Sequence, residues 1–385
     1  MKRFKLNRRM MVIAGVSAFL AGCQVVPKGV DTGPAPAPTP TPTTSTLPED
    51  LTRHRIALLV PLSGSNAGVG QSIANATTMA LLDTNANNLR ITTYDTATGA
   101  KSAAARAIAD GNKLVLGPLL GSNVGAVLSE ARGANVPLIS FSNDTGAAGA
   151  DAFVMGHIPE QSIDRTVRYA RANGARNFAV LVPDGDYGRR AASALSDSVR
   201  AVGGTVAATE SYARGNTSII SAAQRLKEKG GYDTVLIPDG ARLAAAGAAE
   251  LKSGSIQPRL LGTELWSGEN SVASSVALRG ALFSAVSDGR YRRFSDSYNT
   301  RFAGQPYRIS TLGYDAVLLV LRIAQDWKVG SNFPTAKLRD SGGFLGLDGP
   351  FRFRRDGVVE RSMEVREVRA GEVVIVDAAP ARFAD

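Results

Sequence analysis

The sequence contains one cysteine and two histidines in 385 residues, and this scarcity excludes several classes of protein. Without a second cysteine the chain cannot form an intrachain disulfide, and a cluster of thiolate metal ligands is excluded as well. His54 and His157 lie far apart, and neither stands beside a nucleophile motif. The patterns HExxH, G-x-S-x-G and Walker A are also absent. We therefore expect a non-enzymatic protein without a cofactor or a metal.

Dense clusters of positive charge are absent too. The chain has 44 basic and 34 acidic residues, for a net charge of +10. Five of the basic residues precede residue 10, so the remainder is only modestly basic. No run of lysine and arginine is interleaved with aromatic residues, so a nucleic-acid partner is not expected.

The N-terminal segment has the pattern of a secretory signal. Basic residues are followed by an apolar stretch, 10–21, that is too short to span a bilayer as a helix. The sequence Leu20-Ala21-Gly22-Cys23 resembles the lipobox of bacterial lipoproteins. The resemblance implies that 1–22 is a lipoprotein signal peptide and that Cys23 is lipidated, which anchors the chain to a membrane. An ordinary signal with an incidental cysteine is the alternative.

A spacer is expected after this signal. Residues 23–52 include the lipidated N-terminus and a stretch rich in proline, threonine and alanine. Such a composition cannot bury a core, and it favours an extended polyproline II tether of ~3 Å per residue. In enteric sorting, an aspartate after the lipidated cysteine marks retention at the inner membrane. Gln24 stands at this position, which favours a periplasmic protein anchored to the outer membrane.

The rest of the chain alternates apolar strand patterns with amphipathic helix patterns. Continuous apolar strands between helices are typical of parallel sheets that are covered on both faces. The fold class is therefore α/β, with two doubly wound, Rossmann-like lobes and a hinge. Strands are expected at 55–60, 90–94, 113–116, 136–141, 178–182 and 234–237, and helices at 71–82, 101–109, 123–132, 161–173, 189–201, 219–229 and 242–251.

Several motifs resemble those of type I periplasmic binding proteins of the leucine/isoleucine/valine class. They include Ile56-Ala57-Leu58-Leu59-Val60-Pro61-Leu62-Ser63-Gly64, Leu116-Gly117-Pro118, Asp184-Gly185-Asp186-Tyr187-Gly188 and Tyr314-Asp315-Ala316. The resemblance covers the whole folded region. It implies one lobe from 53–158 plus 289–327 and a second from 159–288 plus 344–377, with hinge closure around a ligand.

Finer features resemble the lipoprotein activators of penicillin-binding proteins. These are Phe141-Ser142-Asn143-Asp144, Gly262-Thr263-Glu264-Leu265-Trp266 and the segment 346–353. That branch stimulates peptidoglycan synthases, which implies a penicillin-binding protein or another envelope protein as partner. Its larger members carry a helical-repeat domain where this chain has the Pro-rich stretch.

The family resemblance also implies a ligand site between the lobes. Ser122, Ser140 and Ser142 match positions that hold a ligand carboxylate in amino-acid binders. Glu264 matches the acid that pairs with the ligand ammonium, and Tyr187 matches an aromatic residue of the cleft. Structural roles explain each of these residues as well: a helix cap for Ser122, strand-end polarity for the other serines, a solvated loop for Glu264 and turn packing for Tyr187.

Asp144 departs from the amino-acid binders, which have a threonine at its position. A carboxylate there would repel a ligand carboxylate by ~4 kcal/mol at 4 Å and an effective dielectric of 20. Two functions therefore compete on one fold. The first is a lipid-anchored regulator of a penicillin-binding protein, and the second is a substrate-binding lipoprotein of an ABC importer for amino acids or similar small solutes.

Overall fold

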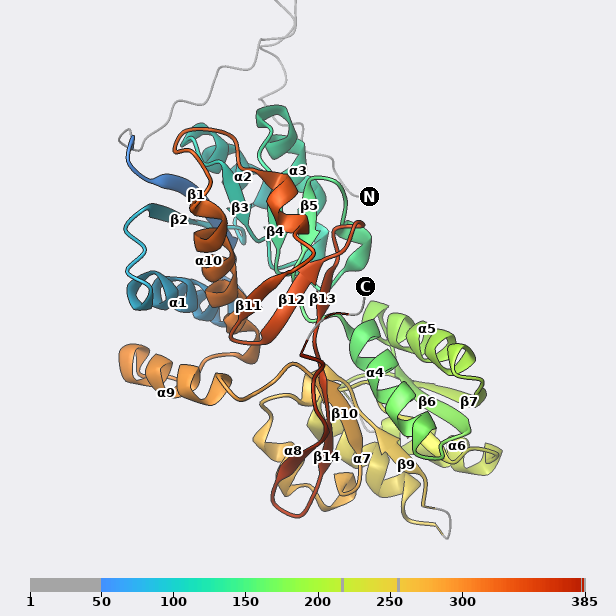
Figure 1. The fold of residues 1–385 in the computed structure, drawn as a ribbon. Coiled ribbons are helices and arrows are strands. Elements are labelled where there is room, and N and C mark those ends of the chain that lie inside the picture. The colour runs from blue at the N-terminus through green and yellow to red at the C-terminus, as the bar shows by residue number, and fades with distance from the viewer. Residues whose placement is uncertain (1–49, 216–217, 255–256, 382, 384–385) are drawn as a thin grey trace, which may run out of the picture. The chain divides into compact units, whose positions relative to one another are not determined.

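The computed structural model describes residues 50–215, 218–254, 257–381 and 383. The predicted signal peptide 1–22, Cys23 and nearly all of the predicted tether lie outside these residues. The described part contains one parallel sheet and one mainly parallel sheet, each with helices on both faces, as the alternation of strand and helix patterns predicted (Figure 1).

Lobe 1 is built on a five-stranded parallel sheet in the order β2-β1-β3-β4-β5. Successive side chains of a strand point to opposite faces, so both faces of β1 bury apolar residues. Ile56 and Leu58 pack toward α10 on one face, whereas Ala57 and Leu59 pack toward α2 and α3 on the other. The elements are β1 (His54–Val60), α1 (Ala67–Asp83), β2 (Leu89–Asp95), α2 (Ala100–Ala109), β3 (Leu114–Leu116), α3 (Val124–Ala131), β4 (Leu138–Ser140), β5 (Ala152–Val154), α9 (Tyr291–Phe302) and α10 (Thr311–Ala324).

Lobe 2 is built on a seven-stranded sheet in the order β15-β14-β10-β9-β8-β6-β7. Its last two strands, β14 and β15, run antiparallel to their neighbours. Helices α4 and α5 cover one face, and α6 and α7 cover the other. The elements are α4 (Pro159–Ala172), β6 (Asn177–Pro183), α5 (Asp186–Ala201), β7 (Thr205–Tyr212), α6 (Ser218–Lys229), β8 (Thr234–Leu236), α7 (Ala241–Leu251), β9 (Arg259–Leu261), α8 (Asn270–Ser274), β10 (Leu282–Ala285), β14 (Glu364–Val368) and β15 (Val373–Asp377).

A third, antiparallel sheet of three strands departs from the sequence analysis, which expected all of 344–377 in lobe 2. Its strands are β11 (Phe344–Gly346), β12 (Gly349–Phe353) and β13 (Val359–Arg361). The aromatic side chains of β11 and β12 join the core of lobe 1, because their rings pack among the residues that α10 covers. Only β14 and β15 enter the sheet of lobe 2.

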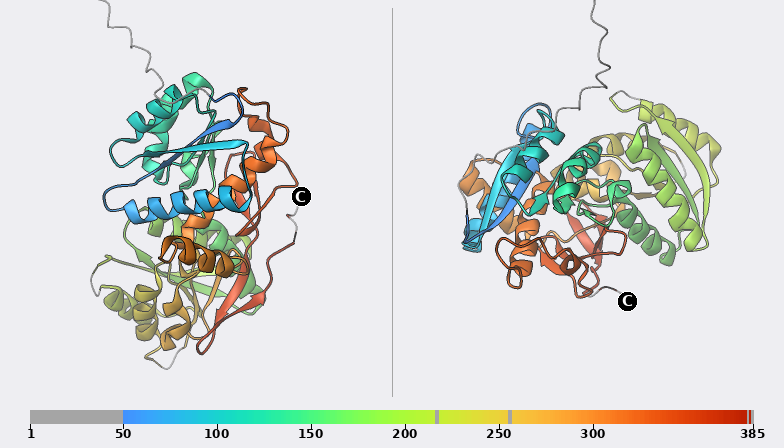
Figure 2. Two further views of the ribbon diagram at one scale, coloured as in Figure 1. Left: turned by 90° about the vertical axis from the view of Figure 1, so that its left-hand side faces the viewer. Right: turned by 90° about the horizontal axis from the view of Figure 1, so that it is seen from above.

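The chain passes between the lobes after β5, after β10 and after β13. Helix α9, which follows the second passage, packs against α1, and the two helices lie side by side in Figure 2. No helix among the described residues is long and apolar enough to cross a membrane.

Candidate functional site

The predicted serines lie where β3 and β4 end, and the structure gives them different environments. The Ser140 hydroxyl is fully buried, donates to the carbonyl of Pro118 at 2.9 Å and accepts from the Ser142 amide at 3.1 Å. The Ser142 hydroxyl accepts from the Asp144 amide at 2.9 Å. Both hydroxyls therefore hold the loop after β4 in place. Ser122 is exposed in the short 3₁₀ turn Gly121–Asn123 that precedes α3, and the N-cap of that helix is Asn123.

Asp144 is exposed and stabilises its own loop. Its Oδ1 accepts from the Gly146 amide at 3.0 Å and caps the short 3₁₀ turn Thr145–Ala147. The side chain also lies against Gly121, where an added Cβ would stand 2.8 Å from the Cβ of Asp144 and 2.9 Å from Oγ of Ser142. The loops after β3 and β4 therefore meet, with a carboxylate beside the position implied for a ligand carboxylate.

Tyr187 and Glu264 come together in lobe 2. The Tyr187 hydroxyl lies 2.9 Å from Oε1 of Glu264 and 2.9 Å from Oγ1 of Thr263. Oε2 of Glu264 is buried and has no hydrogen-bond partner among the described residues. Burial raises the pKa of Glu264 to about 7, and the hydrogen bond from Tyr187 only partly opposes this. Burial and the neighbouring carboxyl also raise the pKa of Tyr187 well above its ordinary value, so its hydroxyl stays a donor.

The sequence analysis missed two arginines beside this pair. Arg214 lies over the Tyr187 ring, with its guanidinium carbon 5.7 Å from the ring centroid, and its Nε bonds Asp239 at 3.0 Å. Arg190 forms a two-point ion pair with Glu160 at 2.7 and 2.8 Å. The same guanidinium donates to the carbonyl of Asn143 in lobe 1 at 2.7 Å. Its spacing of three residues from Tyr187 on α5 was the signal that could have identified Arg190.

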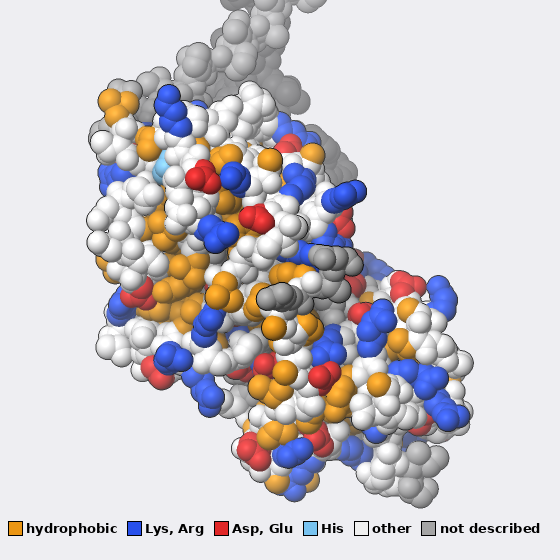
Figure 3. All heavy atoms as spheres, viewed as in Figure 1, with side chains coloured by type: hydrophobic (Ala, Val, Ile, Leu, Met, Phe, Trp, Pro, Cys, Tyr) orange, Lys and Arg blue, Asp and Glu red, His pale blue; other side chains and the backbone are white. Residues whose placement is uncertain are grey.

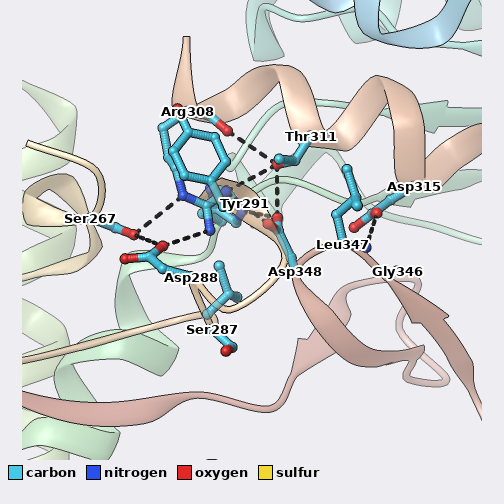
Figure 4. Close-up of polar contacts among 12 residues, drawn as sticks. Ser267, Ser287, Asp288, Tyr291, Arg308, Thr311, Asp315, Gly346, Leu347 and Asp348 are labelled. Atoms are coloured by element: carbon cyan, nitrogen blue, oxygen red, sulfur yellow. Dashed lines mark hydrogen bonds and ion pairs between the residues drawn. The ribbon is translucent and has the colours of Figure 1, made fainter. Parts of the chain in front are cut away.

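A chain of buried charges lies where the lobes are joined, and Figure 4 shows its central part. Arg308 binds Asp348 at 2.7 Å and approaches Asp288 at 3.4 Å. His157 bonds the second oxygen of Asp348 at 2.8 Å, and the Thr311 hydroxyl donates to that oxygen at 3.0 Å. Burial opposes ionisation of Asp348, but Arg308 and His157 hold its pKa well below its usual range.

The charge chain extends from this centre into both lobes. On the lobe 2 side, Arg366 of β14 pairs with Asp288 and with Glu364. On the lobe 1 side, Arg361 lies 3.8 Å from Oδ2 of Asp315 and 3.9 Å from Oδ2 of Asp348. Burial and the charge of Asp348 raise the pKa of Asp315 to about 7. Besides Asp315, three carboxylates face three guanidiniums in this chain of charges.

The described part of the chain offers no candidate metal centre. No group of three or more histidine, cysteine, aspartate or glutamate side chains there is placed to hold a metal ion. The candidate site is therefore a set of polar side chains that includes one carboxyl oxygen, Oε2 of Glu264, without a hydrogen-bond partner in the described part of the chain.

The sequence and fold match the Periplasmic binding protein family over residues 54–372. The chain belongs to this family, whose type I fold the two parallel lobes display. Similar solved structures include LivJ of Streptococcus pneumoniae in complex with isoleucine, at 20% identity and a TM-score of 0.65, with 85% of this chain and 100% of that chain covered. A solute binding protein of an ABC transporter from R. palustris in complex with benzoate is 16% identical with a TM-score of 0.64, and the match covers 86% of this chain and 98% of that one.

Among curated relatives, the penicillin-binding protein activator LpoA of Mannheimia succiniciproducens is 25% identical over 335 residues, which are 83% of this chain and 55% of that protein. LpoA of Pasteurella multocida is 31% identical over 146 residues, covering 37% of this chain and 25% of the relative. An uncharacterized protein of Rickettsia prowazekii is 25% identical over 173 residues, covering 44% and 46%. The chain thus spans about half or less of the length of these relatives.

Proposed function

We propose that this protein is a non-enzymatic, lipid-anchored periplasmic regulator that activates a penicillin-binding protein in peptidoglycan synthesis. The observation that carries the proposal is the likeness to LpoA of Mannheimia succiniciproducens, which extends over 83% of the chain. The lobe 1 side of the cleft supports it. Ser140 and Ser142 use their hydroxyls within their own loop, and Asp144 places a negative charge where an amino-acid carboxylate would bind.

A reconstituted assay tests this function. The full chain in detergent is added to a purified penicillin-binding protein of the source organism, and glycan polymerisation and peptide cross-linking are followed. We expect the chain to increase at least one of the two rates. Unchanged rates, together with no binding between the two proteins, would contradict the proposal.

The second function is that of a substrate-binding lipoprotein of an ABC importer for amino acids or similar small solutes. The buried Oε2 of Glu264, without a partner among the described residues, favours it, because an ammonium group would supply the missing hydrogen bond. Calorimetry with a panel of amino acids separates the two functions. Micromolar binding that Glu264→Ala abolishes would favour the importer function. If no amino acid of the panel binds, the regulator function is favoured.

The proposed anchor has its own test. We propose lipidation at Cys23 and an outer-membrane location, which follow from the lipobox and from Gln24. Cys23→Ser is expected to move the protein from the membrane fraction to the soluble fraction or to leave it unprocessed. Normal processing and continued membrane attachment of the variant would contradict the anchor.

A further inference from the structure

The two edge strands of the lobe 2 sheet differ in how far side chains cover their outward main-chain groups. At one edge, side chains of α6 cover the carbonyls of β7: Lys229 donates to Thr209 at 3.1 Å, and Arg225 donates to Ser211 at 3.2 Å. The same two cations flank Glu210 of this strand. Charged residues and occupied carbonyls are the usual means by which a sheet edge is protected from pairing with another chain.

The opposite edge, β15, has less of this protection. Its first four residues, Val373-Val374-Ile375-Val376, carry no charge and no proline, and the Ile375 side chain is 58% exposed. A charge comes only at the end of the strand, where Asp377 pairs with Arg165 and the register of the ladder shifts. Among the described residues, no hydrogen bond reaches the main chain of these four residues other than those of the ladder with β14. The strand is apolar, extended and open on one side, which is the combination that accepts another strand.

The register shows which main-chain groups are open. The Arg369 amide donates to the Glu372 carbonyl at 2.9 Å, and bonded and non-bonded pairs alternate along an antiparallel ladder. Val373, opposite Val368, is therefore in a non-bonded pair. In agreement, the amide of Val368 donates to the Ala281 carbonyl and its carbonyl accepts from the Gly280 amide, just before β10, rather than bonding to β15. By the same alternation the N–H and C=O groups of Val373 and Ile375 point away from β14.

A cavity of about 760 Å³ borders this edge and is lined from both lobes. Val373 and Ile375 line it from β15, and Tyr291 and Arg292 line it from α9. Asp288, a member of the buried charge chain, lies in the same wall. In Figure 3, hydrophobic side chains mixed with charged ones occupy the face over the β14–β15 hairpin, which is dark red in Figure 1. The rest of the cavity wall is largely polar and includes Asp296, Glu364 and Arg366.

We propose that the penicillin-binding protein partner docks at β15 by adding an extended segment to the open edge. Only a polypeptide backbone offers alternating donors and acceptors that match Val373 and Ile375. A side chain of that segment enters the largely polar cavity between Ile375 and Tyr291. The inference rests on the proposed function, because it assigns the surface that the partner uses. Since α9 belongs to lobe 1 and β15 to lobe 2, the docked segment contacts both lobes.

Three variants of the full chain test the docking surface by their affinity for the purified penicillin-binding protein. Ile375→Pro removes an outward N–H without removing a bond to β14, and Ile375→Asp places a charge on the edge while keeping the main chain. Leu345→Asp is the matched control, because Leu345 is also 58% exposed but lies on β11. We expect at least a tenfold loss of affinity for both Ile375 variants and none for the control.

Hydrogen exchange gives a second measurement. The amides of Val373 and Ile375 should exchange rapidly in the free chain and become protected when the penicillin-binding protein is added. Binding of both Ile375 variants at the unsubstituted affinity would overturn the docking surface and leave the proposed function intact. No binding by the unsubstituted chain would overturn both. A dimer of the chain that Ile375→Pro abolishes, with the penicillin-binding protein still bound, would show instead that the edge pairs with a second copy.

Discussion

The Tyr187 hydroxyl bonds Oε1 of Glu264 at 2.9 Å, and Oε2 of the same carboxyl is buried without a partner among the described residues. One oxygen is thus held by a hydrogen bond, while the other is buried with its hydrogen-bonding capacity unused among the described residues. This arrangement places a carboxyl with a pKa of about 7 at the carboxyl end of β9. An unpartnered buried oxygen costs stability, so it is expected where a bound group supplies the partner.

Glu264→Gln is expected to stabilise the protein at high pH only. Between the ordinary pKa of 4.5 and about 7, the folded state keeps a proton that the unfolded state releases, so stability falls as pH rises through this window. Glutamine does not titrate, so the variant avoids this decrease in the free energy of unfolding, which amounts to about 3 kcal/mol above pH 7. Urea denaturation at pH 4 and pH 8 measures the difference. Glu228→Gln, on the exposed face of α6, is the control. Equal stabilisation at both pH values would contradict the raised pKa.

Asp348→Asn is expected to destabilise the protein by about 3–5 kcal/mol, because it leaves Arg308 and Arg361 buried without their shared anion. Asp356→Asn is the control, since Asp356 pairs with Arg354 at the surface, where both side chains are about half exposed. A surface pair contributes less than about 1 kcal/mol. Urea denaturation at neutral pH measures both variants. A similar decrease in the free energy of unfolding for the two variants would contradict a large contribution of Asp348 to stability.

Arg190→Ala is expected to loosen the two lobes, because Arg190 is the side chain that links Glu160 to the Asn143 carbonyl of lobe 1. Spin labels at exposed positions, Lys101 in lobe 1 and Arg200 in lobe 2, report the distance between lobes in a Cys23→Ser background. We expect a longer and broader distance distribution.

Arg189→Ala is the matched control for this change. Arg189 is adjacent, 70% exposed and paired only with Asp186 of its own helix among the described residues. Its removal should leave the distance distribution unchanged. The same distribution in all three proteins would show that Arg190 does not hold the lobes together.

Gly262→Ala is expected to cost about 1–3 kcal/mol, the usual range for overpacking a buried site. A Cβ at Gly262 would stand 2.4 Å from the ring of Trp266, which is fixed by the bond from its Nε1 to the Asp239 carbonyl at 2.9 Å. Thermal denaturation followed by tryptophan fluorescence measures the change. Gly240→Ala, where an added Cβ meets nothing within 4 Å, should leave the midpoint nearly unchanged.

Much of the α/β order could be predicted from the sequence, because strands buried on both faces are continuous apolar runs. The run at 56–60 forms β1, and 178–182 lies within β6. Strand β7 was missed because its sequence TVAATESY mixes exposed polar residues with buried ones at a sheet edge. The three-stranded sheet was assigned to the wrong lobe because the sequence does not reveal which core receives the phenylalanines of β11 and β12.

The candidate site was predicted less completely. Tyr187 and Glu264 were both predicted as ligand-binding residues from the family resemblance; the structure brings them into contact, and their ligand-binding role stays a prediction. The charge chain was missed because its partners are distant in sequence: His157 and Asp348 are separated by 191 positions. Asp315 lies within a motif that the sequence analysis quoted, yet its raised pKa depends on burial and on Asp348, neither of which the motif encodes.

The entry of the chain into lobe 1 has a mechanical consequence. His54 stacks on Trp327 with ring centroids 4.0 Å apart, and β1 begins at this residue between β2 and β3. Tension applied at His54 along the axis of β1 acts on a strand that is bonded on both sides. Such a load shears several ladder bonds at once instead of opening them one by one. Lobe 1 thus resists tension in this direction without losing the strand on which it is built.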